Sequence, residues 1–138
     1  MGSRDHQHLI DHFVAHAIHR VLIVDDDSDV VSATSMLLSL WGCESASVVD
    51  ASRAEAAALT FRPDVILLDV AMSWINGFEL CRAMKANANY SGIPVVFISG
   101  RSAPSDIETG MSCGAADYFV KPIDTQRLLE RLRELSPE

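Results

Sequence analysis

Five short, mostly apolar runs alternate with amphipathic segments from Arg20 onward, and this alternation constrains the fold more than any other feature. Such a pattern predicts parallel strands joined by crossover helices. Three of the runs are apolar almost throughout, as central strands covered on both faces must be. The sequence therefore predicts an α/β fold with a five-stranded parallel sheet and helices on both faces. The runs are Val21–Val24, Ser45–Val49, Val65–Asp69, Pro94–Ser99 and Asp117–Val120.

The intervening segments predict five helices with recognisable ends. Gly residues stop helices, whereas Asp, Asn and Pro favour their first turns. An alanine-rich segment that extends to about Phe61 forms the second predicted helix. The end signals are Gly42 after the first helix, and Asp50, Asn76, Pro104 and Asp124 at the starts of the other four.

Residues 1–19 lie outside this pattern and form an N-terminal extension. All five histidines belong to it. Apolar residues recur in it at helical spacing, so we expect a further N-terminal helix, unless part of the segment derives from an expression tag. His8, His12 and His16 are four residues apart, but a helix that is exposed or packs on a partner is favoured over a metal site. The apolar positions are Leu9, Ile10, Phe13, Val14, Ala17 and Ile18.

Composition limits the possible functions. A chain of 138 residues with 49% hydrophobic content can bury the core of one domain. Its net charge of -8 argues against direct binding to nucleic acid. No apolar run approaches the roughly 20 residues that cross a bilayer, so no membrane contact is expected. Cys43, Cys81 and Cys113 are odd in number and set in apolar segments, which predicts buried thiols and a cytoplasmic protein.

The stretch VLIVDDDSD, Val21–Asp29, places four carboxylates directly after an apolar strand. Like charges about 4 Å apart repel by roughly 4 kcal/mol at an intermediate dielectric, so an acid cluster needs a cation or a role. Asp27 and Asp29 fit the start of the following helix, where negative charge is favourable. Asp25 and Asp26 remain as candidates for a binding site.

Polar residues follow the other strands as well. The carboxyl ends of parallel strands share one edge of the sheet, so these residues should converge with Asp25 and Asp26. They are Asp69, Ser99 and Lys121. Three acids and one lysine leave an excess of two negative charges, which a hard cation such as Mg²⁺ would cancel. Asp69 could then act as a nucleophile toward a phosphoryl group whose oxygens are neutralised by metal and ammonium.

Four motifs in order, VLIVDDD, ILLDVAMSWINGFEL, VVFISG and YFVKP, resemble the receiver domain of two-component response regulators. The resemblance covers about Arg20 to Leu135, and it assigns residues 20–138 to a receiver domain. It implies a flavodoxin-like sheet of order 2-1-3-4-5. It also implies a phosphoprotein of two-component signalling or a phosphorelay, which catalyses only its own phosphotransfer and autodephosphorylation and is not otherwise an enzyme.

The resemblance also implies a role for each matching residue. Asp69 would accept a phosphoryl group from a sensor histidine kinase or a phosphotransfer protein. Asp25, Asp26, Asp69 and the backbone carbonyl of Ala71 would hold Mg²⁺, and Lys121 would pair with the phosphoryl oxygens. The switched surface would bind a downstream effector or an output domain. Independently of the resemblance, the apolar face of the N-terminal extension must cover something, so a homodimer is a further expectation.

The remaining implied positions concern the switch and its surroundings. Ser99 would bond the phosphoryl group, and Tyr118 would follow it inward. Gly100 would leave the phosphoryl site open, and the bond between Lys121 and Pro122 is expected to be cis. Two departures from the family pattern stand out: Ser73 replaces the usual Pro after Met72, and Ile75 replaces a common Met.

Three other functions compete with a phosphoacceptor. A pseudo-receiver would only bind proteins, but the complete set of acids argues against it. A phosphatase with an aspartate nucleophile would need a second acid two residues after Asp69, where this chain has Ala71. A flavin or nucleotide binder would need glycines and hydroxyls in its first loop, whereas the sequence DDDSD would repel a phosphate.

Overall fold

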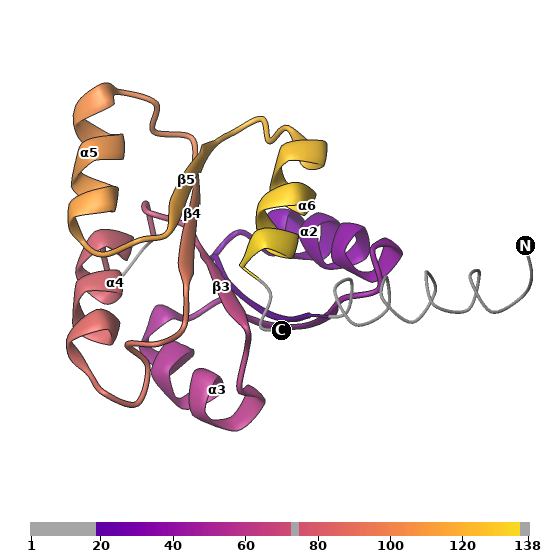
Figure 1. Cartoon of the computed structure of the whole chain (residues 1–138), viewed down its shortest axis with the longest axis horizontal. Helices are drawn as coiled ribbons and strands as arrows, with labels where there is room; N and C mark the ends of the chain where they lie inside the picture. The colour runs from indigo at the N-terminus through magenta and orange to yellow at the C-terminus, as the bar shows by residue number, and fades with distance from the viewer. Residues whose placement is uncertain (1–18, 73–74, 136–138) are drawn as a thin grey trace, which may run out of the picture.

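A computed structural model describes residues 19–72 and 75–135 of the chain. Strands and helices alternate along it (Figure 1). The elements are β1 (Arg20–Val24), α2 (Ser28–Leu40), β2 (Glu44–Val48), η1 (Ala51–Arg53), α3 (Ala54–Phe61), β3 (Val65–Leu68), α4 (Gly77–Ala86), β4 (Val95–Ser99), α5 (Pro104–Ser112), β5 (Asp117–Val120) and α6 (Thr125–Glu134).

The sheet has five parallel strands in the order β2-β1-β3-β4-β5, which confirms the predicted fold and strand order. Central β1 pairs with two neighbours, Leu22 lying beside Ala46 of β2 and Ile66 of β3. Each strand was predicted to within one residue at either end. β2 and β5 form the two edges, so the three apolar runs are the interior strands.

Helices cover both faces of the sheet and bury a core on each. Side chains alternate along a strand, so Leu22 and Val24 point to one face while Val21 and Ile23 point to the other. The first face packs against α3, α4 and α5, and the second against α2 and α6 (Figure 1). In α6, Leu128 and Leu132 are fully buried, as their spacing predicts.

Capping side chains start most of the helices where the sequence indicated. Asp27 accepts hydrogen bonds from the amides of Asp29 and Val30, so it caps α2 as expected. Asn76 and Asp124 cap α4 and α6 in the same way. The prediction for Asp50 was only partly correct: its carboxylate accepts from the Ser52 amide and caps the short η1, and α3 begins after that turn.

The three cysteines are buried, as predicted, and none of them forms a disulfide. Cys81 of α4 lies against the start of the loop after α5, its sulfur 3.7 Å from the Cys113 carbonyl oxygen. Burial, followed by the neighbouring Cys113, raises the pKa of the Cys81 thiol to about 11. In the described ranges, no helix combines the length and the apolar character that a bilayer crossing needs. The predicted N-terminal helix lies outside these ranges.

Gly77 fixes the position of the loop that follows β3. Its amide donates to the Val70 carbonyl oxygen at 2.8 Å, which brings α4 directly against this loop. A Cβ atom at position 77 would clash with the Asp69 carbonyl oxygen and lie 2.8 Å from the Val70 Cα. No side chain fits there without a shift of the backbone, because both neighbours are main-chain atoms.

Replacing Gly77 with Ala should therefore destabilise the domain by about 1–3 kcal/mol or more, the usual cost of overpacking. Urea unfolding followed by circular dichroism measures this loss. Gly92→Ala is the matched control, because a Cβ at that position meets no atom within 4 Å. Equal stabilities for the two variants would show that the close approach at Gly77 does not hold in solution.

Candidate functional site

The carboxyl ends of β1 and β3 bring two predicted site residues side by side. The Asp69 amide donates to the Val24 carbonyl oxygen at 3.0 Å, so the pairing of β1 with β3 continues one residue beyond the strands. The Asp25 amide makes the equivalent bond to Val48 of β2 at 3.1 Å. Regular sheet hydrogen bonds therefore place both acids, and no unusual loop conformation is required.

Three carboxylates meet at this edge. One oxygen atom from each of Asp25, Asp26 and Asp69 lies within 4.8 Å of the other two. Asp25 is 4% exposed, whereas Asp26 is open to solvent and Asp69 is partly buried. The acids thus form a cluster with one buried and one open side, which a solvent-borne ion or a phosphoryl group can approach.

Lys121 brings a positive charge to the cluster. Its backbone amide donates to the Ser99 carbonyl oxygen at 2.8 Å, which ties the residue after β5 to the end of β4. Its ammonium nitrogen lies 3.5 Å from one carboxylate oxygen of Asp25. The other Asp25 oxygen accepts the amide of Asp27 at 2.9 Å. Both oxygens of the buried acid are therefore partnered.

Asp69 is held in an environment that disfavours its charge. Burial and, next, the negative charge of Asp25 raise the pKa of the Asp69 carboxyl above its usual value. The Lys121 charge and nearby backbone amides act in the opposite direction but do not cancel these two effects. A bound cation at the cluster would relieve the same repulsion.

The donor set fits a hard divalent cation. All three groups are carboxylates, the ligands that Mg²⁺ and Ca²⁺ prefer, and among residues 19–72 and 75–135 no thiol or imidazole joins the cluster. Partial solvent access suits Mg²⁺ better, because this ion usually keeps several water ligands. Asp25, Asp26 and Asp69 are thus the residues that could hold the metal.

Ser99 and Tyr118 both bond the backbone of Arg101, in the loop after β4. Ser99 is 1% exposed, and its hydroxyl oxygen accepts the Arg101 amide at 3.1 Å. The Tyr118 hydroxyl donates to the Arg101 carbonyl oxygen at 2.8 Å. Its ring packs near Phe97, and a Cβ at Gly110 would lie 2.9 Å from it. The loop after β4 therefore contacts both side chains.

The other predicted positions border the site, and the backbone amide of one of them, Ala71, bonds the Asp69 carboxylate. A Cβ at Gly100 would meet no atom within 4 Å, so the space beside Ser99 is open. Ala71 is exposed and pairs with Asn76 in an isolated bridge. The peptide bond between Lys121 and Pro122 is cis, as expected. Ser73 and Trp74 lie outside the described residues.

Two features of the site were missed by the sequence analysis. The Asp25–Lys121 ion pair was not anticipated, because the lysine was expected to await an incoming group. The contact of Gly77 with the Asp69 backbone was also missed. Its signal was the Asn-Gly pair at the start of α4, since a glycine there is unexplained by helix propensity.

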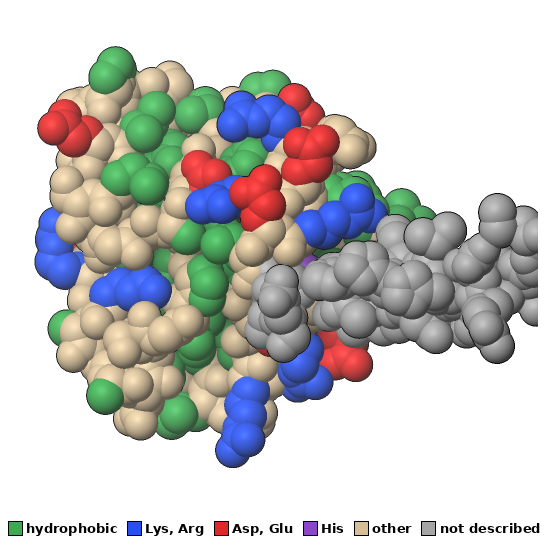
Figure 2. All heavy atoms as spheres, viewed as in Figure 1, with side chains coloured by type: hydrophobic (Ala, Val, Ile, Leu, Met, Phe, Trp, Pro, Cys, Tyr) green, Lys and Arg blue, Asp and Glu red, His purple; other side chains and the backbone are tan. Residues whose placement is uncertain are grey.

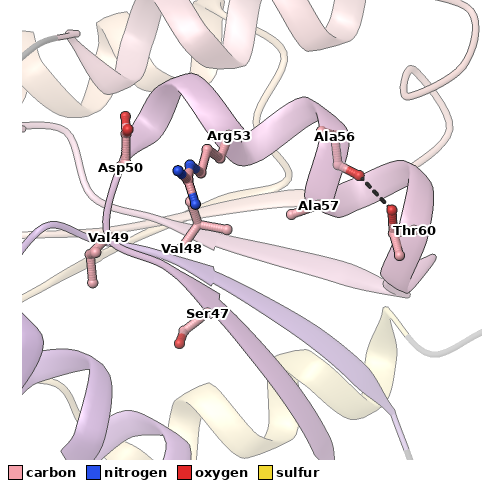
Figure 3. A pocket seen from close by; sticks show the side chains of 8 residues that line it. All are labelled: Ser47, Val48, Val49, Asp50, Arg53, Ala56, Ala57 and Thr60. Atoms are coloured by element: carbon pink, nitrogen blue, oxygen red, sulfur yellow. Dashed lines mark hydrogen bonds between the residues drawn. The ribbon is translucent and has the colours of Figure 1, made fainter.

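A hollow of about 800 Å³ lies apart from the acid cluster, beside β2 and α3 (Figure 3). None of the clustered acids lines it. Its walls are mostly small or apolar, with Arg53 the sole cation among the residues that form it. They are Ser47, Val48, Val49, Asp50, Arg53, Ala56, Ala57 and Thr60.

Comparison with known proteins places this arrangement in a family. The sequence profile described as "Response regulator receiver domain" matches residues 21–133. "Transcriptional regulatory protein PrrA" of Mycobacterium tuberculosis is 40% identical over 116 residues, which cover 84% of this chain and 49% of PrrA. "DNA-binding response regulator MtrA" of the same organism is 33% identical over 114 residues, 83% of this chain and 49% of MtrA. The chain therefore spans about half the length of these curated relatives.

Solved structures agree with the sequence matches. The chemotaxis protein CheY4 of Vibrio cholerae superposes with a TM-score of 0.78 at 31% identity, covering 86% of this chain and 99% of that one. The BeF3-activated N-terminal receiver domain of Klebsiella pneumoniae RstA gives a TM-score of 0.80 at 25% identity, with coverage of 86% and 99%. The sequence profile matches the chain only from residue 21, after the N-terminal extension.

The raised pKa of Asp69 yields a stability prediction for the metal-free protein. A carboxyl with a raised folded-state pKa loses stability as the pH rises through that value, so ionised Asp69 is unfavourable near pH 7. Asp69→Asn should therefore stabilise the protein in EDTA by up to about 1 kcal/mol, or roughly 3 °C in Tm.

Thermal unfolding at pH 7.5 measures this gain, and added Mg²⁺ should reduce it. Asp50→Asn serves as the control, because Asp50 also follows a strand at this edge but its pKa is lowered by hydrogen bonds from Ser52. That substitution should bring no gain. A loss of stability in Asp69→Asn would contradict the proposed repulsion.

Proposed function

Because this chain belongs to the response regulator receiver domain family, we propose that it accepts a phosphoryl group on Asp69 in a Mg²⁺-dependent reaction. The donor is a phosphohistidine of a sensor histidine kinase or of a phosphotransfer protein. One observation carries the proposal: oxygens of Asp25, Asp26 and Asp69 converge within 4.8 Å, and the Lys121 ammonium lies 3.5 Å from Asp25.

Asp69 is the acid best suited to attack phosphorus. Asp25 already uses one oxygen for the Asp27 amide and the other for Lys121, whereas Asp26 is the most exposed of the three. Asp69 is partly buried and reaches the open side of the cluster. An Asp69 oxygen would form the new bond to phosphorus while the bond from phosphorus to the donor nitrogen breaks, and the donor histidine leaves neutral after taking up a proton.

Charge neutralisation determines when this transfer can occur. A phosphoryl group adds negative charge beside acids that already repel each other. Mg²⁺, when bound by Asp25 and Asp26 with Asp69 and the Ala71 carbonyl, would supply the positive charge that the incoming oxygens need. Lys121 would turn from Asp25 toward the phosphoryl group, because a full ion pair with it is available there.

The change in charge would reach the surface through Ser99 and Tyr118. Ser99 now accepts the Arg101 amide, and its hydroxyl could donate to a phosphoryl oxygen instead. That motion would pull on the loop to which the Tyr118 hydroxyl is bonded, through the Arg101 carbonyl. The β4–α5 loop would thereby couple the site to the surface of α5 and β5, a two-state element biased by new charge.

The partners and output follow from the family and stay proposals for this chain. Its two quoted mycobacterial relatives are described as a DNA-binding response regulator and a transcriptional regulatory protein, and about half of each has no counterpart here. We expect the switched surface to contact an effector protein or an output domain. The complete acid set disfavours a pseudo-receiver, and Ala71 in place of a second acid disfavours an aspartate-nucleophile phosphatase.

Intact-mass analysis tests the phosphoacceptor directly. Incubation with acetyl phosphate and Mg²⁺ should add one phosphoryl group to the chain, and EDTA should prevent the addition. Asp69→Asn should abolish it, whereas Asp50→Asn should be labelled normally because Asp50 lies outside the cluster. Label on a residue other than Asp69, or labelling at full rate in EDTA, would refute the assignment.

The proposed switch can be followed in the tyrosine rings. The chain has only two tyrosines, so 3-fluorotyrosine labelling gives two ¹⁹F signals, from Tyr118 and from the buried Tyr90. Beryllofluoride with Mg²⁺ should shift the Tyr118 signal and leave that of Tyr90 nearly unchanged. Ser99→Ala should reduce the Tyr118 shift severalfold, because the loop loses its hydroxyl. An unchanged Tyr118 shift in that variant would rule out the route through Ser99.

A further inference from the structure

The outer face of α2 lacks the charges expected of a solvated helix. Residues 30–43 contain no Asp, Glu, Lys, Arg or His. By contrast, charged side chains of both signs gather over α6 in Figure 2, as is usual for a helix that faces water. The two most exposed large hydrophobic side chains in the described ranges both belong to α2: Leu40 is 79% exposed and Met36 is 69% exposed.

These two side chains border a groove. They are four residues apart and therefore neighbours on one side of the helix. The groove between them and the edge strand β2 has a volume of about 520 Å³. Serines supply its polar lining, and no lining residue is charged. We call this surface the α2 patch, which consists of Val31, Ser32, Ser35, Met36, Ser39, Leu40 and Ser47.

The N-terminal extension joins the domain at the end of this patch. His19 is 2% exposed, and its carbonyl oxygen accepts the Glu44 amide at 2.8 Å. Glu44 opens β2, only four residues after Leu40, and Gly42 makes the turn between them with φ of +81°. His19, where the described part of the chain begins, therefore lies beside the carboxyl end of α2.

The extension has the chemistry to cover the patch. Six apolar residues between positions 9 and 18 recur at the spacing of one helical face, and the opposite face carries Asp11, His12 and His16. As a helix, ten residues span about 15 Å, while the 13 residues of α2 span about 20 Å. The face of the extension is apolar, and the α2 patch combines apolar side chains with uncharged serines. The two surfaces are similar in length, and neither needs a charged partner.

We propose that residues 9–18 pack as a helix across the α2 patch of their own chain. Residues 9–18 are covalently attached at His19, so their contact with the patch is intramolecular. A short covalent connection gives an effective concentration in roughly the millimolar range. The extension of a second copy would have to exceed that concentration to replace it. The apolar face of the extension and the Met36–Leu40 surface then cover each other, and the histidines face solvent.

Hydrogen exchange of the whole chain, followed by mass spectrometry, tests the contact. Peptides from residues 9–18 should be protected, and the double variant Met36→Lys, Leu40→Lys should speed their exchange at least tenfold. Leu59→Lys is the matched control, because Leu59 is a large apolar residue on α3 with 53% exposure and lies outside the patch. It should leave exchange in residues 9–18 unchanged.

A substitution on the other side of the contact completes the test. Phe13→Lys should speed exchange in residues 9–18 as much as the double variant does, and combining all three changes should add little further. Exchange at the rate of an unstructured chain in the parent protein would overturn the proposal. So would a concentration-dependent dimer, seen by light scattering, that Phe13→Lys dissolves, because the extension would then cover another copy.

Discussion

Parallel strands that end at one edge impose an electrostatic cost on this protein, and the rest of the site is a response to it. Sheet hydrogen bonds from Asp25 to Val48 and from Asp69 to Val24 hold both acids at the strand ends. The carboxylates cannot move apart without breaking the pairing of β1 with its neighbours. The Asp27 amide and the Lys121 ammonium satisfy Asp25, so the remaining repulsion falls on Asp69. A site built this way is stabilised by a bound cation, which offsets the repulsion among the acids.

The sequence predicted the fold and the meeting of the acids for the same reason: both depend on the strand pattern alone. Apolar runs identify the strands, parallel pairing sets their direction, and the residues that follow each run must share an edge. The strand ends were therefore predicted to within a residue, and Asp25, Asp26 and Asp69 were expected to come together. The order of the strands needed more, because periodicity does not specify it, and came from the resemblance to receiver domains.

Features that depend on side-chain packing were beyond the sequence. The 3₁₀ turn before α3 reflects a choice between two helical geometries that share the Asp50 cap. The Asp25–Lys121 pair depends on a lysine rotamer, and the close approach of Gly77 to Asp69 depends on how α4 seats against the sheet. The bond from Tyr118 to the Arg101 carbonyl involves a backbone group, which no residue pattern reveals. Each of these details affects how tightly the loops around the acids are held.

The sulfur chemistry of the α4–α5 side has a consequence for how the protein tolerates oxidants. Peroxide attacks a thiolate, and a thiol with a pKa of about 11 is almost wholly protonated in the cell. Cys81 and Cys113 are also shielded from solvent, at 0% and 3% exposure. Peroxide therefore has little access to these two thiols, whereas the thioether of Met111 on α5 is 44% exposed. On this side of the molecule, an oxidant would reach the surface of α5 before it reached the packing between α4 and α5.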